Sequence, residues 1–250
     1  MSDRPEIGVL CLQTSFDKIP GHIRNPATFD FPVRYRVVEG ATPQRLVREA
    51  DPTLLEPFVT AARDLADAGV AGITGACGFL VLFQAELAAA VDVPLWSSSL
   101  VQLPMVHRMV GRTVGLLVAD EQALTPRHLA AVGAQDVPVA VTGMAGQPEF
   151  REVMLEGRRD TLDVDRLAAE VDERVDALAG AHRDLGALVV ECTDLVPFAH
   201  RIQARLGLPV FDIVTLTTMA YATLTRRPYP AAGGARTSRS RAANSSGLPP

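Results

Sequence analysis

The sequence predicts an α/β protein made of two pseudo-symmetric domains, each built on a parallel sheet, with the active site in the cleft between them. Short apolar runs alternate with amphipathic stretches of helical period along most of the chain. One segment of the first half recurs in the second half. The 250 residues are 48% hydrophobic and 21% charged, which is enough to bury one large core or two small ones.

The apolar runs predict seven strands, and the amphipathic stretches predict six helices between them. The strands are expected at residues 7–12, 71–76, 93–96, 113–118, 137–142, 187–191 and 208–211. The helices are expected at residues 52–68, 80–90, 122–132, 164–182, 196–206 and 215–225. Residues 14–51 then form a long irregular connection rich in Pro, Gly and Asn, and we expect it to close over a bound ligand.

An internal repeat defines the two halves. Residues 77–94 align without a gap with residues 192–209, and the identical pairs are Cys77/Cys192, Leu80/Leu195, Val81/Val196, Phe83/Phe198, Ala89/Ala204 and Pro94/Pro209. The matched cysteines are the most informative pair, because the chain has only three cysteines to place. We therefore expect an N-terminal half at 1–112 and a C-terminal half at 113–212. A helix at 213–228 is expected to pack back on the first half, and a disordered tail is expected at 231–250.

Cys77 and Cys192 both fall at the carboxyl end of a predicted strand, which is where ligands bind in open α/β sheets. Two thiols that face each other across a cleft suit the inversion of a stereocentre. One thiol removes an α-proton and the other returns a proton to the opposite face. Backbone amides at the following helix N-termini, at Gly78 and Thr193, are expected to hold the anionic group of the substrate.

The chain resembles the aspartate/glutamate racemase superfamily, which also includes hydantoin racemases, maleate isomerases and arylmalonate decarboxylases. The likeness rests on the strand near residue 7, on GACGF around Cys77, on ECTDL around Cys192 and on the duplicated layout. It implies a cofactor-independent isomerase, a racemase in which Cys77 and Cys192 act as acid and base on the carbon α to a carboxylate. It also implies that Asp194 assists Cys192 and that Thr193 contacts the carboxylate.

The resemblance implies further substrate contacts in the loop after the first strand, at Gln13, Thr14 and Ser15. Gly78 and Phe79 are also expected at the substrate, because they replace an Asn and a Thr that follow the first cysteine in many amino-acid racemases of the family. Because of these replacements, the sequence does not identify which small carboxylate is the substrate.

Three other functions stay open on the same residues. A decarboxylase or lyase needs only one of the two thiols as its acid or base. A cysteine hydrolase needs a histidine near Cys77, and the sequence positions none there. A two-lobed protein that binds a small acid without changing it needs neither thiol as a catalyst.

Composition excludes several classes of protein. Lys18 is the only lysine, and it lacks the glycine pattern of a nucleotide site, so Schiff-base, pyridoxal phosphate and Walker A chemistry are not expected. The formal net charge of −5 argues against a nucleic-acid partner. No two histidines have the i, i+4 spacing of a helical metal pair, so no metal is expected.

The apolar runs are too short to cross a bilayer, so no membrane partner is expected. The N-terminal residues do not form a secretory signal, and free cysteines suit a reducing compartment, so a cytoplasmic location is expected. Cys11, inside the first strand, is expected to be an apolar filler. Members of the family that the chain resembles often form dimers, so the resemblance makes a homodimer a possible assembly.

Overall fold

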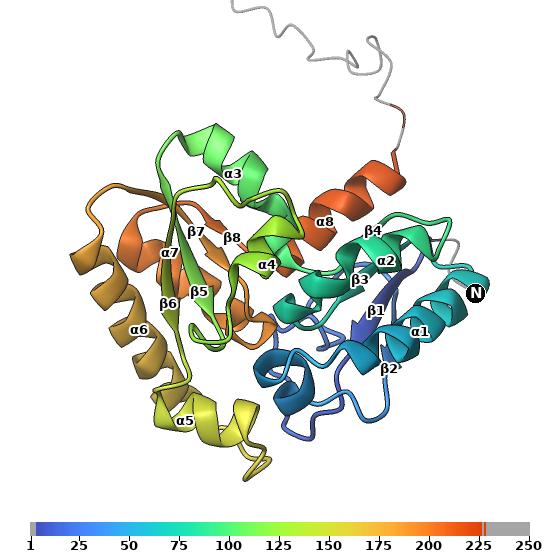
Figure 1. The fold of residues 1–250 in the computed structure, drawn as a ribbon, viewed down its shortest axis with the longest axis horizontal. Coiled ribbons are helices and arrows are strands. Elements are labelled where there is room, and N and C mark those ends of the chain that lie inside the picture. The colour runs from blue at the N-terminus through green and yellow to red at the C-terminus, as the bar shows by residue number, and fades with distance from the viewer. Residues whose placement is uncertain (1–3, 227, 229–250) are drawn as a thin grey trace, which may run out of the picture.

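Two parallel sheets form the frame of the molecule. The structure, a computed structural model, describes residues 4–226 and 228. Its strands pair in the orders β2-β1-β3-β4 and β6-β5-β7-β8, and every pairing is parallel. Each strand of the second sheet occupies the place of the strand four positions earlier in the first, and Figure 1 shows the two sheets in separate lobes. The predicted α/β class with two parallel sheets is confirmed.

The first half of the chain alternates strands and helices. Its strands are β1 (Ile7–Cys11), β2 (Val33–Val37), β3 (Gly72–Gly75) and β4 (Leu95–Trp96). Its α-helices are α1 (Leu55–Asp67), α2 (Gln84–Ala89) and α3 (Leu103–Val110). Short 3-10 helices η2 (Pro52–Leu54), η3 (Gly78–Phe83) and η4 (Ser99–Gln102) and a π-helical turn η1 (Gln44–Arg48) join them.

The second half repeats the order of the strands and adds a helix between its first two strands. Its strands are β5 (Thr113–Val118), β6 (Val139–Gly143), β7 (Leu185–Val190) and β8 (Val210–Phe211). Its α-helices are α4 (Pro126–Ala130), α5 (Pro148–Phe150), α6 (Val164–Ala181), α7 (Ala199–Leu206) and α8 (Ile213–Leu224). A π-helical turn η5 (Arg151–Leu155) and a 3-10 helix η6 (Thr193–Phe198) complete it.

The predicted strands and helices all overlap elements of the structure, but the expectation of a wholly irregular segment at 14–51 is wrong. That segment contains the edge strand β2, which pairs with β1 from Ile7↔Val33 to Cys11↔Val37. Two arginines of β2 point to solvent and pair with Glu6 and Asp64, so the strand lacks the continuous apolar run of a central strand. The segment also contains η1, and helix α3 was not predicted.

One helix from each half packs on the sheet of the other half. Helix α3 packs against β5 and β7, whereas α8 returns to β3 (Figure 1). Trp96 Nε1 of the neighbouring strand β4 donates to Thr217 Oγ1 of α8 at 3.1 Å. Within the described residues, no helix combines the length and the apolar character needed to span a membrane. The expected domain boundaries stay a prediction, and the expected tail at 231–250 lies outside the described residues.

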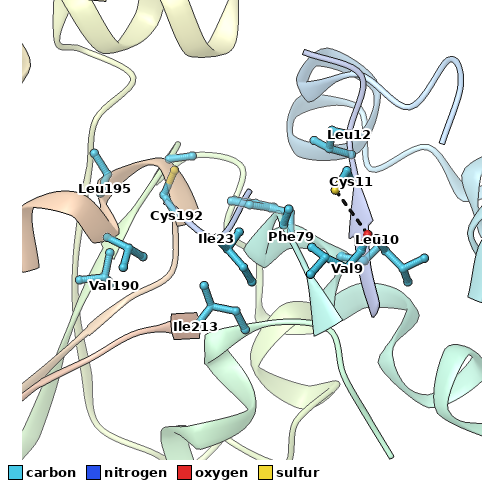
Figure 2. Packing of buried hydrophobic residues seen from close by; sticks show 14 of the residues in the cluster. Val9, Leu10, Cys11, Leu12, Ile23, Phe79, Val190, Cys192, Leu195 and Ile213 are labelled. Carbon is cyan, nitrogen blue, oxygen red and sulfur yellow. Dashed lines mark hydrogen bonds between the residues drawn. The ribbon is translucent and has the colours of Figure 1, made fainter. Parts of the chain in front are cut away.

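A continuous apolar core joins the two lobes. Figure 2 shows Cys192, Val190 and Leu195 from the second half in one cluster with Phe79 and Cys11 from the first. Cys11 is fully buried, its Sγ donates to Val9 O at 3.4 Å, and burial raises the pKa of its thiol to about 11. The shared core fixes the carboxyl ends of β3 and β7 against each other, and this is where the matched cysteines lie.

Candidate active site

The matched cysteines occupy equivalent places in the two lobes. Cys77 follows β3 and precedes η3, and Cys192 follows β7 and precedes η6. Each has extended backbone angles, and its carbonyl accepts a hydrogen bond at 3.1 Å from the amide three residues later, Leu80 N or Leu195 N. The helices that follow are six-residue 3-10 helices that begin directly after each cysteine. The repeat in the sequence therefore corresponds to a repeated turn in space.

Both cysteines line one small cavity between the lobes. Its free volume is about 30 Å³, which is room for one or two water molecules. Its walls are Leu12, Thr14, Lys18, His22, Arg24, Pro43, Val47, Ala76, Cys77, Gly78, Ala119, Phe150, Met154, Leu155, Glu191, Cys192, Thr193 and Asp194. A wider pocket of about 630 Å³ shares Thr14, Pro43, Met154 and Leu155 with it. A ligand larger than water therefore reaches the thiols by displacing side chains at this shared wall.

Both thiols are held in their protonated form. Burial raises the pKa of Cys77, and the nearby carboxyl groups of Glu191 and Asp194 raise it further. Burial also raises the pKa of Cys192, followed by the charges of Asp194 and Glu191. The thiolate form of either cysteine therefore needs a compensating positive charge in the cavity.

Asp194 connects Cys192 to the segment after β1. The Cys192 thiol donates to Asp194 Oδ2 at 3.8 Å, and His22 Nε2 lies 2.9 Å from Oδ1. Arg24 N donates to His22 Nδ1 at 2.9 Å, so the proton of the neutral imidazole lies on Nε2 and is donated to Asp194. Burial lowers the pKa of His22 and favours this neutral form. Burial alone would raise the pKa of Asp194, but the bond from His22 and the charges of Lys18 and Arg24 outweigh it and keep the carboxyl ionised.

Lys18 and Arg24 bring two cations to the cavity. Lys18 Nζ donates to Phe16 O at 3.1 Å and lies over the Phe16 ring, and no described carboxylate lies within ion-pair distance of it. Burial lowers the pKa of Lys18 to about 8, although the charge of Asp194 opposes the shift. Arg24 Nη1 donates to Leu12 O at 3.1 Å and Thr14 Oγ1 at 2.8 Å, and the other guanidinium nitrogens have no hydrogen-bond partner in the described part of the chain. Half-buried cations of this kind are suited to a carboxylate ligand.

Glu191 supplies a second carboxyl group to the cavity. Its Oε2 accepts a hydrogen bond from Ala119 N at 3.1 Å, and the side chain is 1% exposed. Burial raises the pKa of Glu191 to about 8, the Ala119 bond opposes the shift and the charge of Asp194 adds to it. At neutral pH this carboxyl is therefore mostly protonated.

The cavity brings together most of the site residues expected from the sequence. Cys77, Gly78, Cys192, Thr193 and Asp194 line it, together with Thr14. The Thr193 hydroxyl donates to Ala76 O at 2.9 Å, so this group links the two lobes.

The remaining expected residues lie elsewhere. Gln13 and Ser15 line the wider pocket, where Gln13 Oε1 accepts a hydrogen bond from Gly40 N at 2.9 Å and Ser15 Oγ donates to Asp160. Phe79 does not line the cavity, because its ring is 1% exposed and packs edge-on against His128 at 4.9 Å.

Sequence reasoning missed four polar residues of the site: Lys18, His22, Arg24 and Glu191. The first three lie in the segment after β1 that was expected to be a lid, and no motif marked them. One feature of the sequence could have indicated Lys18: it is the only lysine of the chain, and it lies shortly after a buried strand.

No protein-family model matches the chain. Among curated proteins, dimethylsulfoniopropionate lyase 3 of Emiliania huxleyi is 31% identical over 240 residues, which are 91% of this chain and 62% of that protein. Lyase 7 of the same organism is 30% identical over 90% of this chain and 68% of its own length. The dimethylsulfoniopropionate lyase of Durusdinium sp. clade D is 28% identical over 83% of this chain and 71% of its own length. The chain thus spans less than two thirds of the first of these relatives.

Solved structures of several enzymes share the fold. Unliganded arylmalonate decarboxylase matches with a TM-score of 0.55 and 16% identity, over 94% of this chain and 97% of its own. Allantoin racemase from Klebsiella pneumoniae matches with a TM-score of 0.59 and 18% identity, over 88% and 87% of the two chains. Aspartate racemase of Picrophilus torridus matches with a TM-score of 0.52 and 14% identity, over 88% and 93%. At these identities the likeness establishes the fold alone.

The comparisons correct one expectation from the sequence. An isomerase was predicted, but the curated relatives at about 30% identity over most of the chain are lyases. The prediction of the isomerase class is therefore wrong. The cause is physical: two matched thiols indicate proton transfer at carbon, and an elimination begins with the same proton abstraction as a racemisation.

Proposed function

The chain belongs to the dimethylsulfoniopropionate lyase family, within the aspartate/glutamate racemase superfamily that its sequence resembles, and we propose that it eliminates dimethyl sulfide from dimethylsulfoniopropionate. The observation that carries the proposal is the identity to these lyases over nine tenths of the chain. A cavity lined by two thiols and two cations supports it.

The proposed substrate is a zwitterion with a carboxylate at one end and a sulfonium at the other. A base takes the proton on the carbon next to the carboxylate, and the electron pair of that C–H bond forms the new C=C bond. The C–S bond then breaks with its pair on sulfur. The products are neutral dimethyl sulfide, acrylate and one proton, so the step needs one base and no acid for the leaving group.

Lys18 and Arg24 are proposed to bind the carboxylate. The α-proton is weakly acidic, because its removal puts negative charge on the carboxylate oxygens. Two cations in a buried site stabilise that charge more in the transition state than in the ground state. They also fix the end of the substrate, and so the position of the α-carbon.

Cys192 is proposed as the base. Its thiol already donates to Asp194, whose side chain is 21% exposed and held by His22, so Asp194 offers the thiol proton a path towards solvent. Burial disfavours the thiolate of Cys192, and the nearby carboxyl groups of Asp194 and Glu191 disfavour it further. A bound sulfonium cation offsets those carboxyl groups and lowers the pKa of the thiol, so the substrate helps to form its own base.

The proposal is tested by incubating the protein with dimethylsulfoniopropionate. Headspace gas chromatography measures the dimethyl sulfide released, and acrylate is measured as the second product. We expect Cys192→Ser to reduce kcat by about 10²–10³-fold, the usual contribution of a positioned base, and Cys77→Ser to keep a larger share of the activity. Cys11→Ala is the matched control, because this third thiol lies in the core outside the cavity. The proposal fails if the parental protein releases no dimethyl sulfide, or if Cys192→Ser matches it.

A further inference from the structure

Glu191 differs from the other buried glutamates of the protein. Glu149 is held by Arg159 and by the amide of Asp163, and Glu170 accepts from the amides of Glu149 and Phe150. Oε1 of Glu191 is buried and has no hydrogen-bond partner in the part of the chain that the structure describes. A buried carboxyl oxygen without a partner is costly, so its place in the cavity wall needs an explanation.

The opposite lobe makes room for this oxygen. A Cβ atom at Gly78 would lie 2.1 Å from Glu191 Oε1 and 2.5 Å from Glu191 O, closer than any real contact. Only glycine therefore fits beside Cys77 while Glu191 keeps its position. Residues of both lobes hold the carboxyl in place: Ala119 N donates a hydrogen bond to Oε2, and the backbone of Gly78 lies against Oε1.

The charges of the cavity divide by chain segment. Its cations, Lys18 and Arg24, come from the segment after β1, and its carboxyl groups, Glu191 and Asp194, come from the segment after β7. Both carboxylate oxygens of Asp194 already have hydrogen-bond donors, because Oδ1 accepts from His22 Nε2 and Oδ2 accepts from the Cys192 thiol. Among the carboxyl oxygens of the cavity in the described residues, Oε1 of Glu191 is thus the one without a hydrogen-bond donor, and it can interact with a ligand.

We propose that Oε1 of Glu191 is the anionic partner of the substrate's onium group, and that it selects a carboxylate with a cationic head over its neutral isostere. This assignment rests on the proposed function, and it names the part of the site that recognises the sulfonium. The ring of Phe150, which also lines the cavity, offers a second surface for a cation. Glu191 is in this scheme a binding residue, and the base remains Cys192.

The resting site holds Glu191 as the neutral acid, since burial raises its pKa to about 8. A cation beside Oε1 favours the carboxylate, so onium binding near pH 7 releases a proton from Glu191. The other titratable groups that face it are Cys77, Cys192 and Asp194; the two thiols have raised pKa values, and Asp194 is already ionised. Preference for the onium is therefore expected to increase as pH rises towards 8.

Two unreactive ligands of equal shape separate charge from size. The first is 3-(trimethylammonio)propionate, whose trimethylamine is a poorer leaving group than dimethyl sulfide, and the second is 4,4-dimethylpentanoate, in which carbon replaces the charged nitrogen. Titration calorimetry measures both dissociation constants. The parental protein is expected to prefer the ammonium ligand by at least about tenfold, as for a charge-assisted contact. Glu191→Gln is expected to reduce this ratio to about one.

Glu121→Gln is the matched control, because it removes a carboxylate of the same half whose side chain is 47% exposed and outside the cavity. It is expected to keep the parental ratio. A parental protein without preference, or Glu191→Gln with the parental ratio, overturns the assignment. So does loss of the preference in Asp194→Asn with its retention in Glu191→Gln.

A measurement on the parental protein alone covers the case in which Glu191→Gln does not fold. Calorimetry at pH 7 in two buffers of different ionisation enthalpy counts the protons released on binding. The ammonium ligand is expected to release a proton and 4,4-dimethylpentanoate is not; equal release by both overturns the assignment. Failure of the proposed function is distinct, because dimethylsulfoniopropionate then yields no dimethyl sulfide while the preference for the onium persists.

Discussion

His22 and Asp194 are joined across the two lobes by a 2.9 Å hydrogen bond from Nε2 to Oδ1. The imidazole is 3% exposed, and Arg24 N fixes its tautomer through Nδ1. The segment after β1 thus holds the carboxylate that accepts a hydrogen bond from the Cys192 thiol. A contact between residues 172 positions apart in sequence sets the environment of the proposed base.

Replacement of His22 tests this coupling. His22→Phe removes the donor to Asp194, and we expect kcat to fall about 10-fold to 100-fold, the usual worth of a hydrogen bond to a charged group. His22→Gln places an amide NH₂ near the position of Nε2 and is expected to recover much of the loss. The measurement is kcat and KM for dimethyl sulfide release in both variants, with folding checked by circular dichroism. Equal activity of the phenylalanine and glutamine variants would show that the hydrogen bond is dispensable.

Lys18 makes substrate binding depend on pH. Its pKa is lowered to about 8, first by burial, so the ammonium is present below pH 8 and is lost above it. The groups that act on it are Asp194, Arg24, Cys11 and Cys192. We expect the affinity for propionate, measured by calorimetry from pH 6.5 to 9.5, to fall above about pH 8.

Two variants isolate this effect from other titrations. Lys18→Arg keeps its charge over the whole range, so the fall above pH 8 should be absent. Lys18→Met should bind propionate about tenfold or more weakly at pH 7 and show no such transition. If the fall in affinity above pH 8 persists in both variants, a group other than Lys18 causes it.

Much of the fold was predictable because its signals are local. Apolar runs marked the buried strands, and the matched cysteines marked equivalent turns that end at one cavity. The edge strand β2 was missed because Arg34 and Arg36 interrupt its apolar residues, although strict alternation in Val33–Val37 is itself typical of a strand with one exposed face.

The polar half of the site was not predictable in the same way. The role of Lys18 depends on the fold of a long segment that returns its side chain to the cavity, and scarcity of lysine in the composition was taken as evidence against lysine chemistry. The contact between Gly78 and Glu191 joins residues from different lobes, and no local pattern encodes it.

Gly78→Ala tests that contact directly. The added Cβ would meet Glu191 Oε1 at 2.1 Å and Glu191 O at 2.5 Å, so carboxyl and backbone must both move. We expect a loss of about 1–3 kcal/mol in the free energy of unfolding, typical of overpacking, together with loss of the preference for the ammonium ligand. Gly180→Ala is the control, because its Cβ meets nothing within 4 Å, and it should leave stability unchanged or slightly higher. Equal urea midpoints for the two variants would contradict the close approach.

The buried carboxyl of Glu191 also predicts how stability depends on pH. Its pKa is about 8 in the folded protein, chiefly because of burial, against an ordinary value of 4.5. Between these values the unfolded chain has released a proton that the folded protein still holds, so the free energy of unfolding falls as pH rises from 5 to 8. The full effect is about 5 kcal/mol at most, because one pKa unit corresponds to about 1.4 kcal/mol.

Glu191→Gln lacks this titration, whereas the other ionisable groups are common to both proteins. Urea unfolding of the two proteins at pH 5, 6, 7 and 8 measures the difference. We expect the glutamine variant to gain stability relative to the parental protein steadily across this range. A difference that is constant with pH would mean that Glu191 is ionised throughout, and that the cavity already offers its carboxylate a partner. A widening difference would show that the folded protein carries a destabilising acid where a cationic ligand is proposed to bind.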